Sequence, residues 1–133
     1  MKTASLKAKG RRLQNWVCEQ ISKMLGIPYG KDCLIESREM GQSGVDVKLY
    51  AEAREKYPFA IECKNCERWN LPGWIRQAKA NQKEGTDWQL FISKNYYDPI
   101  VVMDAEAWFD FYEQYYKSVW SPGSDAQQTI RRP

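Results

Sequence analysis

The sequence predicts an α/β fold with a mixed central sheet flanked by helices, in the element order α-β-β-β-α-β-β-α. Segments with the 3.6-residue apolar period of a helix are interspersed with segments whose apolar residues alternate, as they do in half-buried strands. Glycine, proline and polar residues separate these segments over short distances, for example at Gly26 and Pro28. At 133 residues the chain has the length of one domain.

The first predicted helix covers residues 11–25. At about 100° per residue, Gln14 falls inside its apolar face, whereas Glu19 falls on the solvent side. A buried amide needs hydrogen-bond partners, and either a polar site beneath the helix or ordinary core contacts would supply them. The expected apolar face consists of Leu13, Val17, Ile21, Met24 and Leu25.

Three strands are predicted to follow, at residues 33–37, 44–50 and 58–64. Alternation places Asp46 on one face of the second strand, and Glu62 and Lys64 together on one face of the third, with Cys63 turned toward the apolar side. If these two strands pair as an antiparallel hairpin, the three ionisable side chains converge on the surface opposite the apolar layer.

The second half of the chain predicts a helix, two strands and a helix. The "LPG" at 71–73 is expected to act as a breaker, and Asp104 is a candidate N-cap. The four elements are expected at 73–84, 88–93, 100–103 and 104–117. We therefore expect a single domain over 1–117 with a basic N-terminal arm, followed by a flexible tail over 118–133.

The charge is unevenly distributed although the net charge is only +3. Five cations precede the first acidic residue, Glu19, and such a basic end favours an anionic partner. The N-terminus lacks the apolar core of a signal peptide, and no run approaches the ~18 apolar residues of a membrane span. We therefore expect a soluble cytoplasmic protein. The five cations are Lys2, Lys7, Lys9, Arg11 and Arg12.

The "CKNC" at 63–66 has the spacing of a zinc knuckle or a redox pair. The chain has four cysteines and no histidine, so a zinc site would need Cys18 and Cys33 from distant segments. The strand alternation also turns Cys63 inward. The sequence therefore predicts free or structural thiols.

The two acids and the lysine have a chemistry in common. Carboxylates on adjacent strands are hard oxygen ligands suited to Mg²⁺, which keeps several waters and can hold a phosphate oxygen. A lysine beside them can orient or deprotonate the attacking water. The alternative for Asp46, Glu62 and Lys64 is an exposed hairpin face with weak ion pairs.

The helix expected at 73–84 carries Arg76, Lys79 and Lys83 within about 60° of one another, with Gln77 at the border. Such a stripe is either a solvated face or, beside a metal site, a track for phosphates.

These residues resemble the PD-(D/E)XK nuclease superfamily. Asp46 of "GVDV" is followed sixteen positions later by Glu62 of "IECK". The opening "KGRRLQNWV", together with "SREMGQSGVDVKL" and "IRQAKAN", is similar to small phage-encoded members related to Holliday junction resolvases. The resemblance covers about residues 9–117.

The resemblance implies a role for each matching residue. Asp46 and Glu62 would be metal ligands, with the backbone carbonyl of Cys63, and Lys64 would be the catalytic lysine. Gln77 would fill the polar position on the following helix. The chain departs from the pattern at Val45, where the motif's proline stands, and at Gln14, where resolvases carry a glutamate.

The resemblance further implies a restriction-endonuclease-like core and a DNA endonuclease that uses Mg²⁺, with Mn²⁺ as a substitute. The expected substrate is branched or structured DNA, cut in the host cytoplasm by a phage protein that pairs as a homodimer. The alternatives are a nuclease of flap or single-stranded DNA, a DNA-binding protein that does not cut, and an interaction module. The expected DNA contacts are Lys9, Arg11, Arg12, Arg76, Lys79 and Lys83.

Overall fold

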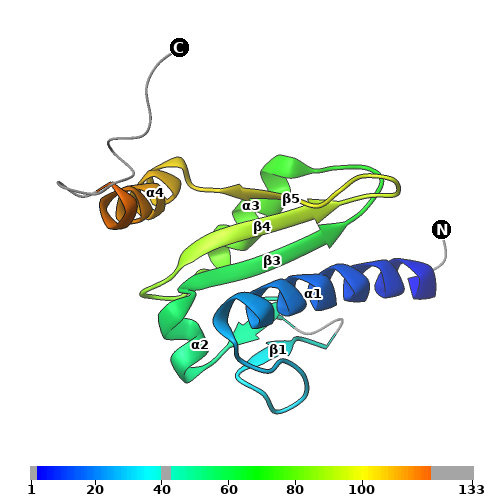
Figure 1. Cartoon of the computed structure of the whole chain (residues 1–133). Coiled ribbons are helices and arrows are strands. Elements are labelled where there is room, and N and C mark those ends of the chain that lie inside the picture. Colours follow the sequence, from blue (N-terminus) through cyan, green and yellow to red (C-terminus); the bar gives the residue numbers. More distant parts are fainter. Residues whose placement is uncertain (1–2, 40–42, 121–133) are drawn as a thin grey trace. The chain divides into compact units, whose positions relative to one another are not determined.

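The computed structural model describes residues 3–39 and 43–120 and shows an α/β fold (Figure 1). Its helices are α1 (Thr3–Leu25), α2 (Ala51–Lys56), α3 (Leu71–Ala80) and α4 (Ala105–Val119). Its strands are β1 (Ile35–Ser37), β2 (Val47–Leu49), β3 (Phe59–Asn65), β4 (Asp87–Ser93) and β5 (Ile100–Met103). Within this part of the chain, no helix is both long enough and apolar enough to cross a membrane.

The five strands form one mixed sheet in the order β1-β2-β3-β4-β5. Strands β3 and β4 are parallel, and the other neighbouring pairs are antiparallel. The connection between the parallel strands contains α3, as a parallel crossover requires. The predicted mixed sheet flanked by helices is therefore confirmed.

The chain divides into two compact units, Met1–Met103 and Asp104–Pro133. The first contains the sheet with α1, α2 and α3, and the second contains α4. The domain boundary predicted at residue 117 falls inside α4. Residues 121–133, which make up most of the predicted tail, lie outside the described residues.

Helices α1 and α3 cover opposite faces of the sheet (Figure 1). Because β3 is central, its side chains alternate between two cores. On the α1 side, Ile61 and Cys63 join a cluster that includes Leu13, Val17 and Ile21. On the α3 side, Ala78 packs with Trp88, Leu90 and Ile92.

Two helices differ from their predicted bounds, and one was not predicted. Helix α1 begins at Thr3, so the expected basic arm is part of a helix. Helix α3 begins at Leu71, because Pro72 fits a first turn and the Asn70 side chain caps it, accepting from the Gly73 amide at 3.3 Å. The expected breaker is therefore a helix start. The unpredicted α2 has the sequence AEAREK, which consists of good helix formers.

The predicted antiparallel pairing of β2 and β3 is confirmed, but it is short. The register aligns Val47 with Ile61, and the Asp46 amide donates to the Ile61 carbonyl at 2.8 Å. Strand β2 begins at Val47, where the expectation was residue 44. Asp46 therefore lies where the two strands part.

Candidate active site

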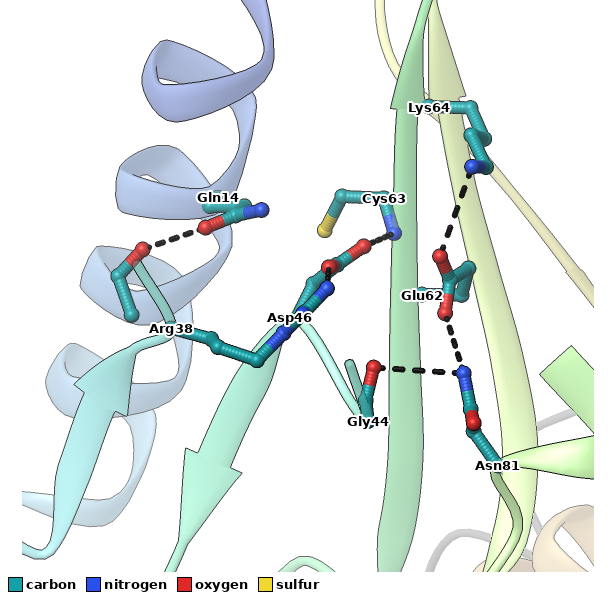
Figure 2. Close-up of polar contacts among 9 residues, drawn as sticks. Gln14, Arg38, Gly44, Asp46, Glu62, Cys63, Lys64 and Asn81 are labelled. Carbon is teal, nitrogen blue, oxygen red and sulfur yellow. Dashed lines mark hydrogen bonds and ion pairs between the residues drawn. The ribbon is translucent and has the colours of Figure 1, made fainter. Parts of the chain in front are cut away.

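Asp46 and Glu62 are both buried where β2 and β3 part, with 4% and 2% of their surfaces exposed. Glu62 and Lys64 face the α3 side of the sheet, because they are aligned with Leu90 and Ile92 on β4. Both carboxylates are removed from water, which contradicts the alternative of an exposed hairpin face. Figure 2 shows Asp46 between the strands and Glu62 directed toward Lys64 and Asn81.

Both oxygens of Asp46 accept hydrogen bonds. The Cys63 amide donates to Oδ2 at 2.7 Å, and Nη2 of Arg38 donates to Oδ1 and forms an ion pair with it. Arg38 follows β1 directly, and its own amide donates to the Asp46 carbonyl at 2.8 Å. The sequence offered no signal for Arg38 beyond its place in the "SREMGQSGVDVKL" stretch.

Glu62 lies between an ammonium group and an amide (Figure 2). Its Oε1 is 3.7 Å from Nζ of Lys64, and Nδ2 of Asn81 donates to Oε2 at 3.4 Å. Burial and, to a smaller extent, the charge of Asp46 together raise the pKa of Glu62 from its usual 4.5 to about 7, while Lys64 opposes the shift. Ionisation of Glu62 is therefore disfavoured by its burial beside a second carboxyl group.

Gln14 is buried on the α1 side of the sheet, with 3% of its surface exposed. The hydroxyl of Ser37 donates to its Oε1 at 2.7 Å, and Figure 2 shows the amide pointing toward Cys63. Glu19 is partly exposed and pairs with Lys23 at 3.0 Å, so the predicted orientation of the helix is confirmed. The geometry favours core contacts as the role of Gln14.

Two predicted positions on the helices lie away from the expected place. Met24, assigned to the apolar face of α1, is 62% exposed, although Ile21 and Leu25 near the same end of the helix pack in or against the core. Gln77 is exposed on α3, and Asn81, one turn later, is the residue that reaches Glu62. The spacing of four residues is the signal that would have suggested Asn81.

The side chain of Cys63 lies in the core beneath α1, as its strand position predicted. Burial raises the pKa of this thiol well above its usual value, so it stays neutral. All four cysteines are free, in agreement with the predicted thiols. The backbone of Cys63, in contrast, belongs to the site, because its amide donates a hydrogen bond to the Asp46 carboxylate.

The donor set fits a Mg²⁺ ion. Asp46 and Glu62 offer hard carboxylate oxygens. The backbone carbonyl of Cys63 would be the third protein ligand, since the backbone amide of the same residue already donates to Asp46. Across residues 3–39 and 43–120, no group of three or more Cys, Asp or Glu side chains could hold a metal. Such a sparse set suits Mg²⁺, which keeps several waters.

Two surface hollows meet at Arg38. The β2 hollow includes Lys48, Arg54 and Lys83 with Arg38, and no acidic residue is among the described residues that line it. The α1 hollow is lined by Lys7, Arg11, Asn15, Ser37, Arg38 and Glu39. Mostly positive side chains therefore surround Arg38, which pairs with Asp46.

The predicted DNA contacts are divided between these hollows and other surfaces. Arg11 and Lys83 line the hollows, whereas Arg12 and Arg76 are exposed elsewhere. Lys79 is exposed on α3, with Nζ 5.9 Å from the ring centre of Trp88. Lys9 is 4% exposed and pairs with Glu67 at 3.6 Å. Lys48 and Arg54, which sequence reasoning missed, join the hollows because the fold brings β2 and α2 to the site.

In comparisons with known proteins, no family model matched the chain, and no curated protein or solved structure was significantly similar to it.

Proposed function

We propose that this chain is a metal-dependent DNA endonuclease that hydrolyses phosphodiester bonds. The observation that carries the proposal is the convergence of Asp46, Glu62 and Lys64 where β2 and β3 part, with both acids buried. A buried pair of carboxylates is costly to keep unless a cation or a proton compensates it. The convergence of these residues supports the resemblance of "GVDV" and "IECK" to the PD-(D/E)XK motif and a restriction-endonuclease-like core.

The carboxylates and the lysine would have different roles in the reaction. Asp46 and Glu62, with the Cys63 carbonyl, would hold Mg²⁺, which supplies a nucleophilic water and stabilises charge on the phosphate. Lys64 bridges the buried acid and solvent, since 23% of its side chain is exposed and its Nζ is 3.7 Å from Glu62. It can therefore orient the attacking water or offset charge on the phosphate. Asn81 keeps the Glu62 carboxylate in place.

The basic hollows supply the means to hold DNA. Lysines and arginines bind backbone phosphates, and the absence of acids from the described lining of the β2 hollow removes the main source of repulsion. The substrate proposed is branched or structured DNA, on the strength of the resemblance to resolvases. Two copies of the chain would then cut two strands symmetrically.

A second candidate is a DNA-binding protein that does not cut. It is favoured by one observation, the ion pair of Arg38 with Asp46, which together with the Cys63 amide engages both carboxylate oxygens. In that case the basic hollows would still bind DNA, and Asp46 and Glu62 would have only a structural role.

The test is incubation of the purified protein with labelled junction, flap, duplex and single-stranded DNA, in Mg²⁺, Mn²⁺ or EDTA. We expect cleavage in both metals, none in EDTA, and the fastest cleavage on the junction. Asp46→Asn protein, prepared in the same way, controls for contaminating nucleases. DNA binding without cleavage of any substrate would establish the second candidate instead.

A further inference from the structure

Arg38 is unusually placed for a charged side chain. Only 10% of the side chain is exposed, and one nitrogen, Nη2, donates to Asp46. The remaining nitrogens, Nε and Nη1, are buried and have no hydrogen-bond partner among the described residues. Guanidinium is charged at every accessible pH and has five N–H donors, so leaving several of them without acceptors is costly. In this conformation both carboxylate oxygens of Asp46 have hydrogen-bond donors, whereas two nitrogens of Arg38 have no acceptor among the described residues.

The charges around Arg38 explain why it is there. Asp46 and Glu62 supply up to two negative charges, and Lys64 and Arg38 supply two positive ones within reach of them. The site is therefore balanced without a metal. A divalent ion placed on the Asp46 carboxylate would lie against the guanidinium, and two such cations repel strongly in a buried setting.

We propose that Arg38 is a displaceable counter-ion: it neutralises Asp46 while no metal is bound, leaves that carboxylate when the metal enters, and then binds a DNA phosphate in the flanking hollows. The inference rests on the proposed function, because it concerns the same metal site. It adds a residue that couples metal binding to DNA binding.

The backbone keeps the displaced side chain nearby. The backbone amide of Arg38 donates a hydrogen bond to the Asp46 carbonyl at 2.8 Å. Only the side chain of Arg38 therefore has to rotate for the guanidinium to leave the Asp46 carboxylate. Arg38 also lines both the β2 hollow and the α1 hollow, where the neighbouring charges are mostly positive. A phosphate in either hollow would provide acceptors for Nε and Nη1, in the forked geometry that arginine prefers.

The first test is a calorimetric titration of Ca²⁺ and Mn²⁺ into wild-type protein and Arg38→Met protein without DNA. Methionine keeps the length of the side chain and removes the charge. We expect Arg38→Met to bind both metals about ten- to a hundredfold more tightly, since a hydrogen bond between charged groups no longer has to be broken. Arg54→Met is the matched control, because Arg54 lines the same hollow but donates to the Glu84 carbonyl at 2.7 Å.

The second test measures DNA affinity in Ca²⁺ and in EDTA. If release frees Arg38 for a phosphate, Ca²⁺ should strengthen DNA binding by wild-type protein more than by Arg38→Met protein. In EDTA, where Arg38 is held by Asp46, the two proteins should bind DNA within about threefold of each other. An equal effect of Ca²⁺ on both proteins would overturn the coupling.

The outcomes separate this inference from the proposed function. Wild-type cleavage together with unchanged metal affinity in Arg38→Met would overturn the inference and leave the nuclease standing. Metal binding by Arg38→Met alone, with an inert wild type, would mean that Arg38 is a permanent replacement for the metal, and the inference fails. No cleavage and no metal binding by either protein would defeat both proposals.

Should Arg38→Met fail to fold, the wild type provides the test. Crystals grown with Mn²⁺ are expected to show metal at Asp46 and the Arg38 guanidinium turned into a hollow. A guanidinium still on Asp46 beside a bound metal would overturn the displacement.

Discussion

Two buried polar clusters lie beside β3, and they are built differently. On the α1 side, the neutral amide of Gln14 meets the hydroxyl of Ser37 at 2.7 Å. At the other site, Asp46 and Glu62 bring like charges together, and the pKa of Glu62 rises to about 7. A neutral, complementary pair stabilises a fold, whereas two like charges destabilise it until something else binds.

The difference identifies which buried polar residues can do chemistry. Gln14 was a site candidate because a buried amide needs partners, and the core supplies one. Asp46 and Glu62 are partnered by Arg38, Lys64 and Asn81, yet the raised pKa of Glu62 shows that ionisation of this one carboxyl remains unfavourable. Perturbed ionisation in a cleft is typical of active sites.

The strongest test of this contrast is on cleavage itself. Asp46→Asn or Glu62→Gln is expected to abolish cleavage in Mg²⁺ and to leave DNA binding intact or tighter, because less negative charge repels the phosphates. Gln14→Ala is expected to retain cleavage. Gel assays of rate and affinity measure both. Retained Mg²⁺-dependent cutting by either acid variant would remove the two carboxylates from the mechanism.

Lys64 lies with the acids, and its removal should have the next largest effect. Lys64→Ala is expected to slow cleavage by about 10² to 10⁴-fold, since it acts on the water and the phosphate. Metal binding measured by calorimetry should remain. The exposed Lys56, which pairs with Glu52 at 2.6 Å, provides a control variant, Lys56→Ala, with unchanged rate. Loss of metal binding in Lys64→Ala would assign Lys64 a structural role.

Gln14 should matter for stability. Gln14→Ala is expected to lower the free energy of unfolding by about 1–3 kcal/mol, because the partly buried Ser37 hydroxyl loses its acceptor. Glu19→Ala, on the partly exposed side of the same helix, should change it by less than about 0.5 kcal/mol. Urea unfolding compares the two. The opposite ranking would mean that α1 is rotated and that Glu19 faces the interior.

The stability of the two sites should depend differently on pH. Folding raises the pKa of Glu62 from 4.5 to about 7, so the folded protein holds this proton more tightly than the unfolded chain. The stability contributed by the proton is present below pH 4.5 and is lost as the pH rises through about 7. Metal-free Glu62→Gln protein should therefore gain thermal stability relative to wild type between pH 4.5 and pH 8.

Gln14→Ala is the matched control for that measurement, because an amide does not titrate. Its difference in melting temperature from wild type should stay constant over the same range. If Glu62→Gln gave an equally constant difference, the Glu62 carboxyl would not be protonated in the folded protein.

The smallest expected effect concerns the basic surfaces around the acid site. Lys83 lines the β2 hollow, whereas Arg76 is exposed elsewhere on α3. Each phosphate contact lowers log affinity by about 0.9 per unit of log salt on duplex DNA. Lys83→Ala should therefore flatten the salt dependence by about one unit, and Arg76→Ala should leave it unchanged. If both variants flattened the salt dependence of DNA affinity equally, DNA would bind along the exposed face of the helix and not in the β2 hollow.

The sequence predicted most of the fold because its signals are local. Alternation in 58–64 and helical period in 11–25 correctly assigned the inward sides of Cys63 and Gln14. The same local rules failed at element ends, where Asn70 and Pro72 start a helix at the "LPG" that was expected to act as a breaker. They also missed α2, which lies between the second and third predicted strands.

The sequence by itself determined that Glu62 and Lys64 share one face of their strand, because the period of a strand decides which side chains point the same way. That face was expected to be a surface, and the burial of Glu62 was not predicted. The sequence nevertheless indicated Asp46, Glu62 and Lys64 before any contact was known. Only the tertiary structure decided what those charges meet. Arg38 lies opposite Asp46 just beyond the paired residues of β1 and β2, and Asn81 reaches Glu62 from the end of α3. Such partners depend on strand register and helix ends, which no local pattern specifies.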